Sequence, residues 1–312
     1  MSLVAWKKPY LLQVMLDEEP ENPREECDLF GRMVCWHRKY RLGDEHFFDS
    51  PNDFLKDLVL HTIPENIILD YVGSGKSHFV RLVSIGSHAP KKGLYETETV
   101  EEDGKPLHSG VRVECYDPYT KKWYAEDFFR EEEKKELVGC LVDVLPNGDL
   151  LALAEKENAV LPLHLYDHCQ LHLSASPFLG HAVHAEWDSG QVGWIYATAG
   201  EIQETYGNTS VENMEKAKKL LLSEVETYDY YLSGQCYGFR LYEDGEEIQT
   251  GWGYFGSFSE IVKEIAAEFL PESHRDMVEN LKEMPDTRTY TLGYGNFVEE
   301  LEGMGLAEEM EV

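Results

Sequence analysis

The sequence predicts an α+β protein, with a mainly β N-terminal half and a C-terminal half in which helices pack on an antiparallel sheet. Short apolar runs separated by acidic loops fill the first half of the chain. The second half carries an amphipathic helical pattern over residues 211–232 and an Asp244-Gly245 turn between two β-like runs. These three observations together favour a mixed fold over an all-α or all-β one.

Strands are expected in the first half wherever β-branched and aromatic residues gather. These segments are residues 10–16, 31–36, 67–72, 79–85 and 111–116. Ser50 and Pro51 form a strong helix start, because serine is a favoured N-cap and proline suits the first helical position. The charged segment 125–137 has its apolar residues on one side, which predicts an exposed helix.

The second half has more regular patterns. Residues 161–174 alternate apolar and polar side chains, which predicts a strand or a hairpin turning near Asp167. The helix over residues 211–232 should end before Gly234. The other expected elements are strands at 193–198, 235–242 and 246–252, and helical stretches at 201–206, 258–269, 273–282 and 297–306.

The chain is long enough for two domains. At roughly 150 residues per domain, its 312 residues suggest a division into 1–160 and 161–312. The boundary is expected at the Pro146-Asn147-Gly148 turn or just before Pro162, and the 42% apolar content is enough to form a sizeable core.

The composition is strongly acidic, since 59 Asp and Glu against 28 Lys and Arg give a net charge of −31. A nucleic-acid reader needs a basic surface for phosphates, so we expect no direct nucleic-acid binding. Extended carboxylate arrays can imitate phosphate spacing and attract basic clefts, whereas a gain in solubility explains the charge equally well. The acidic residues gather in segments 17–26, 96–103, 126–136 and 299–311.

No segment has the pattern of a secretory leader, and no apolar run approaches the roughly 20 residues of a membrane span. We therefore expect a cytoplasmic protein with no membrane partner. The six cysteines form no Cys-x-x-Cys pair, which predicts reduced and mostly buried thiols and argues against a zinc knuckle. No cofactor is expected, and assembly into a homo-oligomer is left open.

Gly73-Ser74-Gly75-Lys76-Ser77 resembles the end of a phosphate-binding loop. The glycine that should open that motif is Asp70, and the residues that follow have the pattern of a strand rather than a helix. A glycine-rich turn between two strands is the favoured interpretation, and nucleotide binding is the alternative.

Five of the twelve histidines lie between residues 164 and 184. This clustering suggests metal or acid–base chemistry, with His168, His184 and Asp188 as candidate catalytic residues. Residues four apart on a strand are separated by roughly 13 Å, so the strand histidines cannot easily share one ion, and no metal-ligand set is assigned. A polar strand face is the alternative. Cys169 falls on the apolar side of the alternation, where thiols are usually inert.

The segment 184–193 gathers turn-forming residues in front of an apolar strand. Asp188 opens a tight turn, Gln191 can satisfy backbone groups in it, and Trp187 is expected to anchor the loop on the core. We expect this loop to be the most constrained element, with a structural role favoured and ligand contact as the alternative.

Five groups of motifs are distinctive. They are Trp36-His37-Arg38-Lys39-Tyr40-Arg41-Leu42-Gly43-Asp44 ahead of Ser50-Pro51, Tyr166-Asp167-His168, Ser176-Pro177-Phe178, Trp187-Asp188-Ser189-Gly190-Gln191-Val192-Gly193, and Tyr237-Gly238-Phe239 with Gly251-Trp252-Gly253. Over residues 33–256 the chain resembles uncharacterised proteins of bacteriophages and mobile elements of Gram-positive bacteria. That group has no established activity, so no catalytic residue is carried over. The resemblance implies a protein of an invading element that acts on host machinery in the host cytoplasm.

We expect a binding function. An acidic phage or mobile-element protein would engage a basic surface of a host protein and inhibit it, as a counter-defence protein or a nucleic-acid mimic. The expected contact residues are Trp187, Asp188, Gln191, Trp36 and Arg38. One alternative is a metal-assisted or acid–base hydrolase that uses the region His164–Asp188. The other is a protein that sequesters a nucleotide signal, with a small basic island at residues 38–41 beside Trp36.

Overall fold

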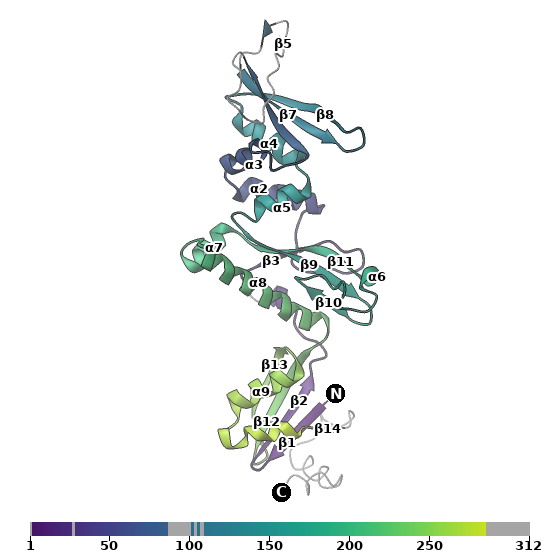
Figure 1. Ribbon diagram of the computed structural model, residues 1–312. Coiled ribbons are helices and arrows are strands. Elements are labelled where there is room, and N and C mark those ends of the chain that lie inside the picture. Colours follow the sequence, from purple (N-terminus) through teal and green to yellow (C-terminus); the bar gives the residue numbers. More distant parts are fainter. Residues whose placement is uncertain (1, 27–28, 87–100, 103–104, 107–108, 285–312) are drawn as a thin grey trace. The chain divides into compact units, whose positions relative to one another are not determined.

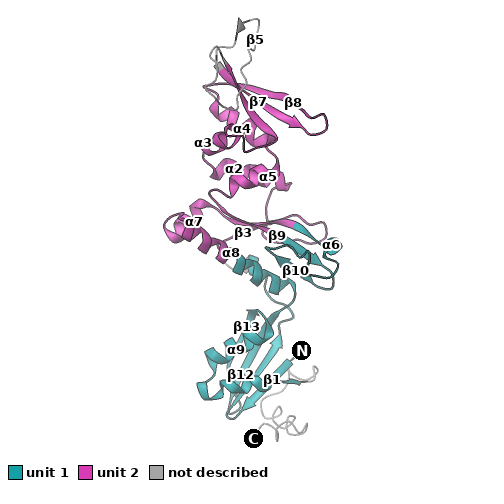
Figure 2. Ribbon diagram, viewed as in Figure 1, with its two compact units in different colours: residues 1–29, 163–191, 222–312 teal, residues 30–162, 192–221 magenta. Residues whose placement is uncertain are grey.

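The computed structural model describes residues 2–26, 29–86, 101–102, 105–106 and 109–284 (Figure 1). The fold is α+β, as the sequence predicts. The chain divides into two compact units (Figure 2): unit 1 is residues 1–29, 163–191 and 222–312, and unit 2 is residues 30–162 and 192–221. Each unit is therefore built from segments that are distant in sequence. The expected division into two domains at residue 160 stays a prediction.

A five-stranded sheet of order β13-β12-β2-β1-β14 forms much of unit 1. Helix α9 packs Ile261 and Ile265 against Leu12, Val14 and Phe239 of this sheet. An apolar face on the helix therefore meets an apolar face on the sheet, which is what stabilises both. The elements are β1 (Ser2–Lys7), β2 (Tyr10–Leu16), α1 (Pro23–Glu26), β12 (Cys236–Glu243), β13 (Glu246–Phe255), α9 (Phe258–Phe269), the 3₁₀ helix η1 (Glu272–Asn280) and β14 (Lys282–Met284).

Within residues 51–154 of unit 2, the described part of the chain has four helices and a three-stranded antiparallel sheet of order β4-β7-β8. Its core includes Phe54, Leu141 and Leu150 from the helices and Val113 from the sheet. The elements are α2 (Pro51–Thr62), α3 (Glu65–Gly73), β4 (Val80–Gly86), β5 (Glu101–Glu102), β6 (Lys105–Pro106), β7 (Ser109–Asp117), β8 (Lys122–Arg130), α4 (Lys134–Val144) and α5 (Asn147–Ala154).

A four-stranded sheet has the order β10-β9-β11-β3. Its strands are β3 (Arg32–Cys35), β9 (Ala159–Asp167), β10 (Leu171–Ser174) and β11 (Ser189–Ala197), accompanied by α6 (Ala185–Asp188), α7 (Ala199–Tyr206) and α8 (Val211–Leu232). Strands β9 and β11 and helix α8 contribute residues to both units. Strands β11 and β3 approach so closely at Gly193 that a Cβ there would lie 1.9 Å from the carbonyl oxygen of Val34. This explains the glycine at that position, since any side chain would displace β3.

The strongest local signals in the sequence are confirmed. Ser50 caps α2 by accepting a hydrogen bond from the backbone N–H of Asp53, with Pro51 in the first turn. Helix α8 spans the predicted residues 211–232 and α9 the predicted 258–269. Asp244 and Gly245 have the positive φ angles that a tight hairpin turn requires.

Two predicted elements are wrong. Residues 67–72 belong to helix α3 rather than to a strand, and Ile68, Tyr71 and Val72 form its buried side at helical spacing. Segment 125–137 is not a single helix, because β8 runs to Arg130 and pairs with β7 before α4 begins. Both errors come from short segments whose state is decided by distant partners.

Parts of the predictions fall outside the described residues. They include the helix at 297–306, the acidic segment 299–311 and most of 96–103. Within the described ranges, no single helix is long and apolar enough to cross a membrane. Helices α4 and α5 meet that criterion only as a pair bent by 120°, and both contribute side chains to the core of unit 2.

Candidate binding surface on the β9–β10 hairpin

The β9–β10 hairpin lies in the part of the sequence where the histidines cluster. Leu171 pairs with Asp167 and His172 with Tyr166, so residues 168–170 form the turn. The predicted alternation therefore stops at Asp167. Cys169 lies in the turn and is exposed, which corrects its expected place on the apolar side of a strand.

The structure brings together the three candidate catalytic residues. His168 Nδ1 and Asp188 Oδ2 are 2.8 Å apart, and the two side chains are 40% and 31% exposed. The ring of His184 lies 5.9 Å from that of His168, measured between centroids. His184 has a left-handed backbone (φ 58°), and its carbonyl accepts the N–H groups of Trp187 and Asp188. The one-turn helix α6 thus carries Asp188 to His168.

Tyr166 holds the loop before α6 against the hairpin. Its hydroxyl donates a hydrogen bond to the carbonyl of Val183, 2.9 Å away. Its ring stacks on those of His168 and Phe178, at centroid distances of 5.9 and 5.4 Å. Partial burial, followed by the negative charge of Asp188, raises the pKa of the Tyr166 hydroxyl. Tyr166 therefore acts as a neutral hydrogen-bond donor that fixes the loop.

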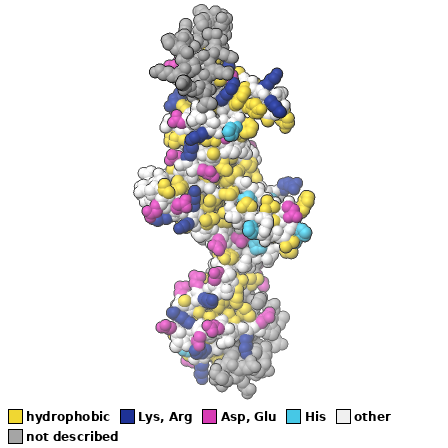
Figure 3. Space-filling view, in the orientation of Figure 1, with side chains coloured by type: hydrophobic (Ala, Val, Ile, Leu, Met, Phe, Trp, Pro, Cys, Tyr) yellow, Lys and Arg dark blue, Asp and Glu magenta, His cyan; other side chains and the backbone are white. Residues whose placement is uncertain are grey.

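The same loop and helix α6 expose three large apolar side chains, which we call the 179–187 apolar residues. Leu179, Val183 and Trp187 are 60%, 67% and 83% exposed. Trp187 is thus not the buried anchor that the sequence suggested. Successive residues of a helix are about 100° apart, so Trp187 points away from the side on which Ala185 is buried. Figure 3 shows hydrophobic and histidine side chains together over β10 and α6.

The segment that carries the histidines and the 179–187 apolar residues has no side chain with a permanent positive charge. The sequence contains no Lys or Arg between Lys156 and Lys216, a range that includes β9, β10 and α6. Among the described residues, no group of three or more His, Cys, Asp or Glu side chains is placed to hold a metal ion. The chemistry available here is that of an oriented His–Asp pair beside apolar and aromatic side chains.

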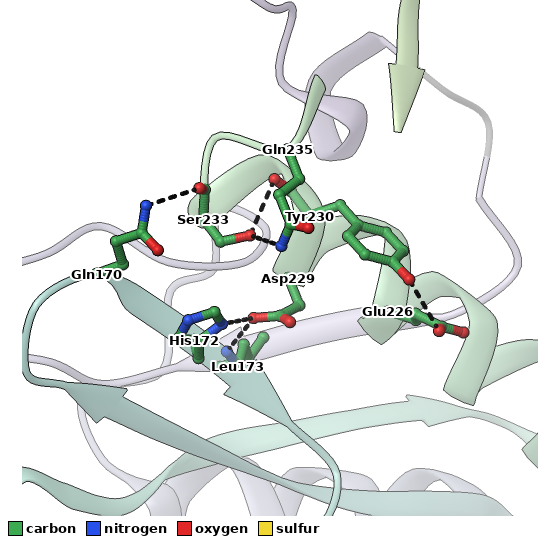
Figure 4. Close-up of polar contacts among 8 residues, drawn as sticks. All are labelled: Gln170, His172, Leu173, Glu226, Asp229, Tyr230, Ser233 and Gln235. Atoms are coloured by element: carbon green, nitrogen blue, oxygen red, sulfur yellow. Dashed lines mark hydrogen bonds and ion pairs between the residues drawn. The ribbon is translucent and has the colours of Figure 1, made fainter. Parts of the chain in front are cut away.

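A second His–Asp pair involves His172 of strand β10 (Figure 4). Asp229 of α8 accepts the backbone N–H of Leu173 at 2.7 Å, and its Oδ1 lies 3.3 Å from His172 Nδ1. Burial raises the pKa of Asp229, although both of these neighbours favour its charged form. The Nε2 of Gln170 also donates to the carbonyl of Ser233. These contacts attach the hairpin to the end of α8, which is a structural role.

The remaining predicted contact residues lie elsewhere. Gln191 is exposed in β11. Trp36 and Arg38 belong to unit 2, where the indole N–H of Trp36 donates to the carbonyl of Phe48 and its ring packs near Phe54. Trp36 is therefore part of an aromatic core, whereas Arg38 is exposed in the loop that follows.

The glycine-rich segment at residues 73–77 is a structural turn, although it joins a helix to a strand rather than two strands. Helix α3 ends at Gly73, and Gly75 has a positive φ of 71°. The Ser77 hydroxyl donates to Asp149 at 2.6 Å and accepts the backbone N–H of Val80. The hydroxyl that a nucleotide-bound Mg²⁺ would require already has structural partners.

Sequence reasoning missed two of the residues that shape the hairpin surface. Leu179 and Val183 lie in an irregular loop with no periodicity, so nothing in the local pattern indicates that they are exposed. No protein-family model, curated protein or solved structure matches this chain. The resemblance to phage and mobile-element proteins therefore stays a prediction.

Proposed function

We propose that this chain is a binding protein that engages a partner with a basic surface through the 179–187 apolar residues in its acidic unit 1. The observation that carries the proposal is the exposure of Trp187, Val183 and Leu179 within nine residues of sequence. Following the resemblance, the partner is a protein of the bacterial host cytoplasm, and binding inhibits it.

The two units differ sharply in charge, which supports a basic partner. Unit 1 has 31 Asp and Glu against 8 Lys and Arg, a net charge of −23, whereas unit 2 has 28 against 20, a net charge of −8. A general requirement for solubility gives no reason for such a concentration. An acidic surface attracts a basic partner over roughly a Debye length and accelerates association.

The apolar residues supply the contact energy in this proposal. Burying an exposed Leu or Val side chain contributes up to about 1.5–3 kcal/mol, and tryptophan is enriched among the residues that dominate interface energies. On the face drawn in Figure 3, Asp and Glu side chains are interspersed with Lys and Arg rather than gathered in one array. That arrangement favours general electrostatic attraction with apolar contacts over close imitation of a phosphate backbone.

Two matched substitutions test the proposal. Val183→Asp places a charge among the 179–187 apolar residues, and Val211→Asp makes the same change at a site of 83% exposure in unit 2. An acidic residue is well tolerated at Val211, because it lies in the first turn of α8. Each immobilised variant is incubated with cytoplasmic extract of a Gram-positive bacterium, and the retained proteins are quantified by mass spectrometry.

The wild type and Val211→Asp should retain the same basic proteins, less strongly at high salt, and Val183→Asp should lose them by about tenfold or more. Equal retention by both variants would remove the 179–187 apolar residues from the interface. Retention that does not change with salt would remove the electrostatic part of the proposal.

A second candidate function rests on the His168–Asp188 pair. When Nδ1 carries the proton it donates to Asp188, and His168 Nε2 is then free to accept a proton from a substrate or water. Hydrolysis of an activated aryl ester should then fall in His168→Ala and Asp188→Asn but not in His181→Ala, a control histidine that is also exposed. Equal rates in all three variants would exclude acid–base catalysis at this pair.

A further inference from the structure

The tip of the β7–β8 hairpin in unit 2 combines aromatic residues with lysines. Residues 119–124 read Tyr-Thr-Lys-Lys-Trp-Tyr. Tyr119 is 95% exposed and Tyr124 50%, and both Lys121 and Lys122 are exposed. Interleaved aromatic and basic side chains are the composition that stacking platforms for unpaired bases use.

Tyr124 is opposite Cys115, which faces the core, so Tyr124 lies on the inner side of the sheet. The outer face carries other aromatic residues. Trp123 is opposite Tyr116 across the β7–β8 pairing, and their ring centroids are 5.3 Å apart. The guanidinium carbon of Arg81 lies 4.3 Å from the centre of the Trp123 ring. Phe79, next to Tyr116 through a backbone hydrogen bond, is 43% exposed. The opposite face of the sheet, with Val113, packs into the core.

The charge here differs from that of the chain as a whole. Arg81 and Arg112 share one carboxylate, since Glu114 accepts the Nε–H of each at 2.8 Å. At the tip, Lys121 and Lys122 lie near Asp117 in the sequence. The Asp117 carboxylate closes the turn, because it accepts hydrogen bonds from the Thr120 hydroxyl and from the backbone N–H of Tyr119. Residues 109–130, the β7–β8 hairpin, contain 4 Lys and Arg against 4 Asp and Glu, a net charge of zero, whereas the whole chain has −31. Glu126 and Asp127 follow along β8 at a β-bulge.

We propose that the β7–β8 hairpin of unit 2 binds single-stranded nucleic acid, with bases stacked on its exposed aromatic rings and phosphates at Lys121 and Lys122. Stacking needs unpaired bases, and a duplex would offer this small surface only its phosphates. This site departs from the expectation of no direct nucleic-acid binding, which rested on the charge of the whole chain. At physiological salt, charges more than about 8 Å away are largely screened, so the local charge governs contact.

Fluorescence anisotropy with labelled oligo(dT) and oligo(rU) tests the proposal on the full chain. Lys121→Glu with Lys122→Glu should weaken binding by about tenfold or more at low salt. The control, Lys134→Glu with Lys135→Glu, makes the same change in net charge at two other exposed lysines of unit 2 and should have little effect. Tyr119→Ala should lower affinity about fivefold or more, whereas Tyr119→Phe, which keeps the ring, should not.

The comparison of oligo(dT) with oligo(rU) shows whether DNA or RNA is preferred, and melting curves confirm that each variant folds. Equal losses in the two lysine pairs would overturn the proposal, because binding would then depend on net charge alone. No binding of either oligonucleotide would also overturn it. If poly-glutamate displaces the labelled oligonucleotide as well as an unlabelled oligonucleotide does, the hairpin binds acidic protein segments rather than nucleic acid.

Discussion

Two His–Asp pairs on one hairpin differ in what their carboxylates contact. The Asp229 side chain is 26% exposed; it contacts His172 and accepts the backbone N–H of Leu173, so it joins β10 to α8. Asp188 holds His168 at the turn, where both side chains are partly exposed. The difference teaches that two His–Asp pairs of similar exposure can differ in what they stabilise, since Asp229 also holds a backbone N–H of the hairpin.

The largest expected effect is at the Asp229–His172 pair. Asp229→Ala should lower the free energy of unfolding by about 1–3 kcal/mol, because it leaves the Leu173 N–H without an acceptor in a largely buried place. Asp188→Ala should lower it by less than about 1 kcal/mol, as is usual for exposed ion pairs. Urea unfolding of the two variants measures the difference. Equal losses would contradict the distinction between the pairs.

Tyr166→Phe should have an intermediate effect. It removes the hydrogen bond to the Val183 carbonyl but keeps the ring that stacks on His168, so the loss should be about 0.5–1.5 kcal/mol. The loop at residues 178–184 should then be cut faster by proteases under native conditions. An unchanged cleavage rate would show that Tyr166 does not hold this loop.

Asp229→Asn should have a smaller effect, which depends on pH. Burial raises the folded-state pKa of Asp229 above 3.8. The stability that this group contributes is therefore fully present below pH 3.8 and is lost as the pH rises through the folded pKa. The variant should be at least as stable as the wild type at pH 7, and the difference should vanish near about pH 3. A wild type that is clearly more stable at pH 7 would show that the ion pair with His172 outweighs burial.

Trp187→Ala should have the smallest effect on stability. Because 83% of the Trp187 surface is exposed, the substitution should change the free energy of unfolding by no more than about 0.5 kcal/mol. Truncating a buried tryptophan would instead cost roughly 3–5 kcal/mol. Binding of the retained partner should nevertheless fall strongly. A large drop in melting temperature would mean that Trp187 packs on the core after all.

The sequence predicted features that depend on neighbouring residues. The Ser50 cap, the spans of α8 and α9 and the Asp244-Gly245 turn are all local, and all are present. The proximity of His168, His184 and Asp188 was suggested by their clustering alone.

Features that depend on distant partners were not predictable in the same way. Strand β8 exists because it pairs with β7, and residues 67–72 are helical because one side packs into the core. Trp187 is exposed because a single turn of helix buries Ala185 instead, and the composition of the loop does not determine that rotation.

Cys169 offers a direct test of the proposed interface. It is exposed in the turn beside His168, whereas burial raises the pKa of the Cys236 thiol to about 12 and of the Cys140 thiol to about 11. Of these three thiols, Cys169 should react first with iodoacetamide, because only a thiolate that is accessible reacts quickly. Peptide mass spectrometry assigns the modified residue.

The decisive measurement is the alkylation rate of Cys169 with and without the basic partner retained in the extract experiment. If the 179–187 apolar residues and the hairpin turn form the interface, the bound partner should slow alkylation about tenfold or more, and Val183→Asp should abolish that protection. An unchanged rate in a complex shown to be saturated would place the partner elsewhere and contradict the proposed binding surface.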